Sequence, residues 1–234
     1  MSATRPAILF LHGALGSSAD MQPLMMLLGE KGYKTLSFNF SGHGASSIWP
    51  EEFPIELFAR ELDKYIKDHA LNEVIVFGFS MGGYVALFHK AHFEESPISM
   101  IFTYGTKFNW SETSVGRELP MMNPDYLQEK FPSFAESLKA KHGLERWKPL
   151  LRSTAHLIQH LERLDGLTRE DLSEVEIPVI LMLGDQDRMV TTEETHLTRS
   201  WLSHGEVKII SHSKHDLDKT NLREIAKILE DQII

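Results

Sequence analysis

A serine flanked by glycines stands where an apolar run meets a segment of helical character. Gly78-Phe79-Ser80-Met81-Gly82 follows the run NEVIVF and precedes YVALFHKAHF. These five residues fit G-x-S-x-G, and a strand before and a helix after are the context that this pattern requires. The sharp turn would expose the hydroxyl at the carboxyl end of a sheet, and the glycines would prevent collisions with neighbouring backbone. The pattern predicts Ser80 as a nucleophile rather than as part of an ordinary turn.

A serine hydroxyl attacks only when an oriented base accepts its proton. Two later apolar runs end in suitable side chains: Asp185 and Asp187 follow PVILML, and His212 and His215 follow EVKIIS. The preceding run, ISMIFTYG, ends without a carboxylate. The residues alone leave both aspartates and both histidines open as partners of Ser80. The two histidines share one loop without a further cluster of ligands, so we expect no metal site there.

Short apolar runs alternate with longer amphipathic ones, which indicates a mostly parallel, doubly wound α/β sheet with helices on both faces. We expect about six strands, over 7–12, 33–40, 72–80, 98–105, 178–184 and 206–211. The alternation stops over 107–176, where only helical patterns occur. This segment is interpreted as a helical cap, and 1–106 with 177–234 as the core.

Composition narrows the class of protein. The chain has 234 residues, 42% of them hydrophobic, which suits one globular domain with an inserted lobe. It contains no cysteine, so disulfides, thiolate zinc sites and a cysteine nucleophile are excluded. The net charge is −9 without any run of basic residues, which argues against nucleic acid and anionic membranes as partners. The first apolar run is too short for a signal peptide or a membrane span, and we expect a cytoplasmic protein.

Five motifs occur in the order typical of one superfamily. LHGALGSS resembles its H-G-x loop, FNFSGHGAS its D-x-x-G-x-G-x-S segment, GFSMGG its nucleophile elbow, GDQDRMV its acid turn and ISHSKHDLDKTN its histidine loop. The chain is therefore identified as a member of the α/β-hydrolase superfamily, in the capped branch with a serine nucleophile. Asn39 stands where the second motif usually begins with aspartate. Since the sequence begins directly at what would be the third strand of this fold, we expect the two antiparallel strands that often precede it to be absent.

The resemblance implies roles for particular residues. It assigns Ser80 as the nucleophile, Asp187 as the acid and His215 as the base, which leaves His212 as the alternative base. An oxyanion hole would use the backbone N–H groups of Met81 and Ala14, with Leu15 as the alternative to Ala14. Asp185 is interpreted as solvated or capping, and His12 and His43 as residues that brace loops.

The resemblance also implies a serine hydrolase without a cofactor, which cleaves an ester, thioester or lactone of small or medium size. Its substrate would bind between core and cap. The candidate pocket residues are Leu15, Phe79, Tyr104, Trp110, Met121, Met122 and Trp147, with Met81 beside them.

Two alternatives stay open. One is carbon–carbon hydrolysis or elimination on the same triad, for which Arg117, Arg146 and Arg152 are candidates to hold a substrate carboxylate. The other is a small-molecule receptor with slow turnover. A monomer or a homodimer is expected.

Overall fold

The computed structural model describes residues 6–50, 52–163 and 166–233. Within these residues the chain forms a six-stranded sheet in the order β2-β1-β3-β4-β5-β6, and every neighbouring pair is parallel. The strands are β1 (Ala7–Leu11), β2 (Thr35–Ser37), β3 (Val74–Phe79), β4 (Ile98–Tyr104), β5 (Val179–Gly184) and β6 (Gly205–Ile210). This confirms the predicted parallel α/β sheet.

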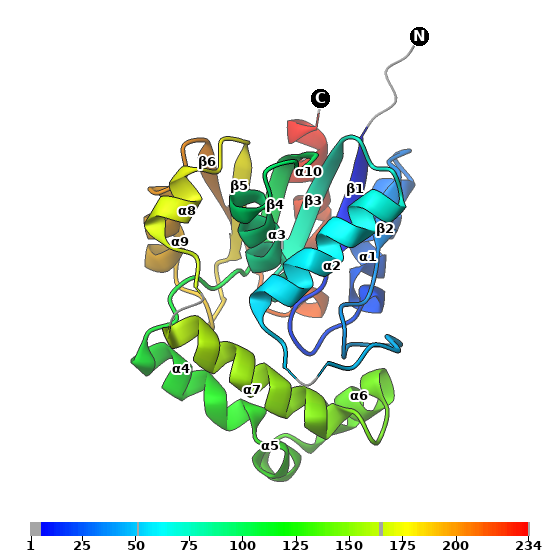
Figure 1. Cartoon of the computed structure of the whole chain (residues 1–234), viewed down its shortest axis with the longest axis vertical. Coiled ribbons are helices and arrows are strands. Elements are labelled where there is room, and N and C mark those ends of the chain that lie inside the picture. The colour runs from blue at the N-terminus through cyan, green and yellow to red at the C-terminus, as the bar shows by residue number, and fades with distance from the viewer. Residues whose placement is uncertain (1–5, 51, 164–165, 234) are drawn as a thin grey trace.

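Helices cover both faces of the sheet (Figure 1). Helices α2 (Ile55–Asp68) and α3 (Met81–His92) lie on one face, and α1 (Gln22–Gly29) and α10 (Leu222–Gln232) pack together on the other. Helix α9 (Thr192–Arg199) contacts β5 and β6. Three short 3₁₀ turns also occur among the described residues: η1 (Ser18–Met21), η2 (Leu119–Met122) and η3 (Leu217–Lys219).

The sequence explains the central elements. Strands β1 and β5 are buried along their whole length, as a strand covered by helices on both faces requires, and they are accordingly continuous apolar runs. Helix α2 buries Ile55, Phe58, Leu62 and Ile66 on one stripe, with the spacing of an amphipathic helix. Pro54 precedes its first turn, where a missing N–H costs nothing.

A layer of helices covers the carboxyl ends of the strands (Figure 1). It comprises α4 (Glu112–Glu118), α5 (Pro124–Lys130), α6 (Pro132–His142) and α7 (Trp147–Arg163), and α7 contacts the other three. Helix α8 (Arg169–Ser173) instead packs on α3 of the core. The layer α4–α7 is called the cap below, and the division of the chain into a core and a cap at 107–176 stays a prediction.

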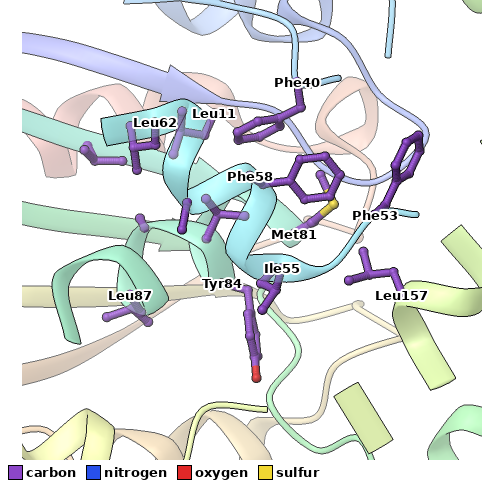
Figure 2. Close-up of a cluster of buried hydrophobic side chains, with 14 of the residues drawn as sticks. Leu11, Phe40, Phe53, Ile55, Phe58, Leu62, Met81, Tyr84, Leu87 and Leu157 are labelled. Carbon is purple, nitrogen blue, oxygen red and sulfur yellow. The ribbon is translucent and has the colours of Figure 1, made fainter. Parts of the chain in front are cut away.

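Core and cap share one apolar cluster (Figure 2). Figure 2 shows Leu157 of α7 directed toward the side chains of Phe53, just before α2, and Ile55, its first residue. Met81, at the start of α3, lies in the same group beside Phe58. Because burial of apolar surface stabilises such contacts, the cap is held against the core close to the residue that follows Ser80.

Candidate active site

Ser80 lies in a strained turn between β3 and α3. Its backbone has φ 50° and ψ −116°, a conformation that costs a non-glycine residue about 1–3 kcal/mol. Hydrogen bonds to its amide and its carbonyl hold it there. The Ser80 amide donates to the Tyr104 carbonyl at 2.8 Å, and the Ser80 carbonyl accepts from Thr106 Oγ1 and from the Gly83 amide, both at 3.0 Å. The strain is therefore imposed by the neighbouring end of β4 and by the first turn of α3.

The flanking glycines are required by close backbone approaches. A Cβ at Gly78 would lie 2.3 Å from the Gly83 nitrogen, and one at Gly82 would lie 2.4 Å from the Leu11 carbonyl oxygen. Contacts this short do not occur in folded proteins, so either side chain would displace the turn. This is the collision that the G-x-S-x-G pattern predicts.

His215 and Asp187 form a hydrogen-bonded pair after β6 and β5. His215 Nδ1 donates to Asp187 Oδ2 at 2.8 Å, and the Asp187 side chain is fully buried. Burial opposes ionisation of this carboxyl. The bond from His215 and the amides of Met189 and Val190, 2.8 and 3.0 Å from Oδ1, outweigh that effect and hold the pKa of Asp187 below its ordinary value. An ionised Asp187 thus fixes the imidazole with Nε2 free to act as a base.

Asp185 and His212 lie differently. Asp185 Oδ1 accepts from the Ser213 amide at 3.1 Å, and amide bonds from His212 and Ser213 lower the pKa of its carboxyl. His212 is exposed, with φ 55°. These positions agree with the interpretation of Asp185 as solvated or capping and with a surface position for His212, and they favour Asp187 and His215 as the pair.

Ser80 and the pair lie at the same edge of the sheet. The Ser80 amide is bonded to the carbonyl of Tyr104, and a Cβ at the next residue, Gly105, would lie 3.1 Å from the His215 ring and 3.4 Å from Asp187. Among the described residues no hydrogen bond joins Ser80 Oγ to His215 Nε2. Catalytic hydrogen bonds are often long before substrate binds. The triad thus stays a prediction that this proximity supports.

The first loop passes over Ser80. A Cβ at Gly13 would lie 3.2 Å from the Ser80 Cβ. The Gly13 carbonyl accepts from His12 Nδ1 at 2.8 Å and from the Gly16 amide at 3.1 Å. Because C=O and N–H point in opposite directions in a trans peptide, the Ala14 N–H is directed away from these donors. Neither this amide nor that of Met81 has an acceptor among the described residues, as an oxyanion hole requires.

His12 is a bracing residue. Its Nε2 accepts from the Phe40 amide at 3.2 Å while Nδ1 donates to Gly13, so both contacts need the neutral ring. Burial is the main cause that lowers its pKa to about 4. Asn39 takes the position of the usual aspartate and accepts from the Ser18 amide at 2.7 Å, so it too holds the first loop.

The predicted pocket residues fall into two groups. Tyr104 is fully buried, and its hydroxyl bonds to the Lys214 carbonyl and to Thr220 Oγ1, so it packs as a core residue. Trp147 is 2% exposed, and it lies in the cap's apolar core with Lys139 and Lys148 over its ring. For both, the observed contacts account for the residue without a substrate.

The others lie nearer the site or at the cap–core junction. The Phe79 ring is 5.4 Å from that of His215, between centroids, and Leu15 is a buried residue of the first loop. The remaining three, which are partly buried against the shared cluster, are Trp110, Met121 and Met122. Trp110 also lines a hollow of about 250 Å³ at the junction, with Phe108, Leu161 and Leu167. Contact with a substrate stays a prediction for each.

Comparison with known proteins decides the family. Residues 6–144 match the model of the family described as alpha/beta hydrolase fold, which covers more than half of the chain. The chain belongs to the alpha/beta hydrolase family. The predicted resemblance is thus confirmed.

Solved structures share the fold of this alpha/beta hydrolase at low identity. NosK from Streptomyces actuosus superposes with a TM-score of 0.80 and 19% identity over 97% of this chain and 96% of its own. The 2-hydroxy-6-oxo-6-phenylhexa-2,4-dienoate hydrolase from Rhodococcus sp. strain RHA1 superposes with a TM-score of 0.75 and 18% identity over 97% and 90%.

Curated relatives match over a shorter stretch. The 2-succinyl-6-hydroxy-2,4-cyclohexadiene-1-carboxylate synthase of Yersinia enterocolitica is 30% identical over 89 residues, which are 38% of this chain and 31% of the relative. The alignment thus spans about a third of the length of the curated relatives that this alpha/beta hydrolase matches.

Sequence reasoning missed several residues around the site. Thr106 bonds the Ser80 carbonyl, and His142 contacts the first loop from the cap. No local sequence pattern distinguishes either residue.

Within the described ranges, no three His, Asp or Glu side chains are grouped so that they could hold a metal ion. No helix of the described chain is long and apolar enough to cross a membrane.

Proposed function

We propose that this alpha/beta hydrolase is a serine hydrolase that cleaves a carboxylic ester, thioester or lactone of small or medium size through an acyl-enzyme. The observation that carries the proposal is the Asp187–His215 pair, with its 2.8 Å hydrogen bond and buried carboxylate, beside the strained turn of Ser80. A fixed imidazole near a serine hydroxyl is the arrangement that activates a serine nucleophile.

The reaction follows from these positions. His215 Nε2 accepts the Ser80 proton as Oγ attacks the substrate carbonyl, and the alcohol or thiol leaves with that proton. The amides of Ala14 and Met81 stabilise the oxyanion, and the N-terminus of α3 adds its positive dipole end. Water, activated by His215, then hydrolyses the acyl-enzyme. Asp187 stays ionised and stabilises the imidazolium in both steps.

Reaction at a carbon–carbon bond on the same triad is a second candidate. The Yersinia synthase and the Rhodococcus hydrolase are both named after carboxylate compounds, which favours this second candidate. Such substrates need a cation in the pocket. Of the candidate lobe arginines, Arg117 and Arg152 are exposed and Arg146 Nη1 donates to the Ser46 carbonyl at 2.7 Å. Among the described residues, no contact directs any of the three at Ser80, which supports the ester reaction as the first candidate.

The first experiment measures release of p-nitrophenol from acetate, butyrate and octanoate esters by the wild type and by Ser80→Ala. We expect turnover that is lost in the variant, because no other hydroxyl in the chain has the elbow context. His215→Ala should remove it as well, while His212→Ala, the matched exposed histidine, should retain it. Turnover indifferent to Ser80 would refute the proposal.

A receptor with slow turnover predicts a different result. Wild-type turnover would then be near background, while ligands would raise the melting temperature strongly by binding only the folded state. A carbon–carbon substrate would instead be consumed without ester turnover, and its loss with Ser80→Ala would support the second candidate.

A further inference from the structure

A buried histidine joins the cap to the first loop of the core. His142 is the last residue of α6, and it is 1% exposed. Its Nε2 lies 2.9 Å from the Leu15 carbonyl oxygen, and its Nδ1 lies 2.9 Å from the Gly44 amide nitrogen. One cap side chain therefore bonds two core loops that are far apart in the sequence, and one of them is the loop proposed to supply an oxyanion amide.

The two partners fix the state of the ring. An amide N–H needs a lone pair at Nδ1, and a carbonyl needs a proton at Nε2, so both bonds form only with the neutral imidazole. The charged and titratable groups that interact with His142 are Lys141, Arg146, Asp20, His12 and His43, and the His43 ring lies 6.1 Å away between centroids. Burial is the main cause that lowers the pKa of His142, which keeps this state at neutral pH.

The loop at the other end of this contact is strained. Leu15 has φ 59°, in the left-handed region that a leucine rarely adopts, and it directly follows Ala14. Without external support the chain would relax to negative φ and rotate the adjacent peptide groups. The neighbouring cap residue adds a second support, since Lys141 Nζ lies 2.7 Å from Asp20 Oδ2, which itself accepts from the Ser17 amide.

We propose that His142 is a positioning residue of the oxyanion hole: its Nε2–H holds the Leu15 carbonyl, and thereby keeps loop 12–18 in the conformation that directs the Ala14 N–H toward the oxyanion. The role in catalysis rests on the proposed function; the role in holding the loop does not. The cap in this view completes the catalytic site in addition to covering it.

Two neutral variants separate the two bonds of His142. In His142→Gln the terminal amide occupies the place of Nε2 and can still donate to Leu15. In His142→Asn the shorter amide occupies the place of Nδ1 and can still accept from Gly44. Both remove an imidazole and neither adds a charge, so a difference between them reports on the Leu15 bond.

Glu194→Ala is the matched control for loosening of the cap. Glu194 Oε1 accepts from the amides of Phe108 and Asn109 at 2.6 and 2.5 Å, so its loss also removes two hydrogen bonds between core and cap. These bonds lie at the start of the cap and do not involve loop 12–18. We expect a lower melting temperature without a specific loss of kcat.

The experiment measures kcat and KM for the best p-nitrophenyl ester, and deuterium uptake of peptides covering residues 12–18. Removal of one oxyanion donor costs about 100- to 1000-fold in kcat, so a displaced donor should cost about 10- to 100-fold. We expect that loss in His142→Asn with KM within about threefold, because the oxyanion exists only in the transition state. His142→Gln should stay within about fivefold of the wild type.

Equal kcat losses in the two variants, or an equal loss in Glu194→Ala, would overturn the catalytic role. Deuterium uptake tests the positioning role even if the wild type turns over none of the esters. Faster exchange of 12–18 in His142→Asn than in His142→Gln would support it, and equal exchange would refute it. Failure of the proposed function would instead show as wild-type turnover that survives Ser80→Ala.

Discussion

A buried histidine remote from the proposed chemistry makes the stability of this protein depend on pH. His89 of α3 is fully buried, and its Nδ1 lies 3.2 Å from Ser96 Oγ. Its Nε2 finds no hydrogen-bond partner among the described residues and lies 3.6 Å from Asp63 Oδ1. Burial lowers the pKa of His89 from 6.5 to about 4, against the opposing effect of the Asp63 charge. The folded state therefore resists a proton that the unfolded chain accepts.

The size of the effect follows from linkage. Above pH 6.5 both states carry the neutral ring, and its contribution to stability is complete. As the pH falls from 6.5 toward 4, the unfolded state alone is protonated, and the free energy of unfolding falls by about 1.4 kcal/mol per pH unit. The loss reaches about 2 kcal/mol at pH 5 and about 3 kcal/mol at pH 4. A domain has only about 5–15 kcal/mol of stability in total, so this loss is large enough to measure.

The test is urea unfolding of the wild type and of His89→Gln at pH 7, 6 and 5, followed by circular dichroism. The variant should be less stable than the wild type at every pH because it loses packing. Its free energy of unfolding, however, no longer depends on protonation at position 89. Its deficit relative to wild type should therefore shrink by about 2 kcal/mol between pH 7 and pH 5. His204→Gln, at an exposed histidine, is the matched control. A deficit that is the same at pH 7 and pH 5 would refute the assignment of a buried, neutral His89.

Three further predictions concern the site. Gly82→Ala would place a Cβ 2.4 Å from the carbonyl oxygen at the end of β1, so it should cost about 1–3 kcal/mol in urea unfolding and most of the activity. Gly29→Ala, where a Cβ meets nothing within 4 Å, should be neutral or stabilising, and equal effects would contradict the argument. Asp187→Asn should lower kcat far more than Asp185→Asn, since only Asp187 bonds the imidazole; the opposite ranking would exchange their roles. Tyr104→Phe removes the hydroxyl that bonds the loop carrying His215. We expect a loss of about 1 kcal/mol in the free energy of unfolding and a lower kcat. An unchanged kcat would show that Tyr104 acts only as a core residue.

Much of the fold was predictable because its signals are local. A strand buried on both faces must be apolar throughout, and β1, β3 and β5 each appear in the sequence as a short apolar run ended by a turn. The bounds of β2 were predicted less well, since only Thr35–Ser37 of the expected 33–40 forms a strand. All three of its residues are half-buried, because β2 lies at the edge of the sheet, and an edge strand is less strictly apolar in sequence.

The cap was predictable only as helical. Its helices alternate buried and exposed residues, but nothing local indicates which helix faces the core. Thus Trp147 was predicted to line the pocket from its type alone, whereas the structure buries it beneath Lys139 and Lys148. Helix α8 was grouped with the cap by sequence position, whereas the structure packs it on α3.

The sequence by itself determined the proposed nucleophile, because the elbow constrains its own neighbours: backbone approaches of 2.3 and 2.4 Å admit only glycine at 78 and 82, and this leaves a readable pattern. Only the tertiary structure decided which groups support them. Tyr104 holds the histidine loop, Thr106 holds the Ser80 carbonyl, and His142 reaches the Leu15 carbonyl across 127 positions of sequence. Each of these contacts is a single hydrogen bond from a side chain to distant backbone. Because the backbone acceptor is the same in every residue, such a bond restricts only its donor and leaves no pattern in the sequence at the other end.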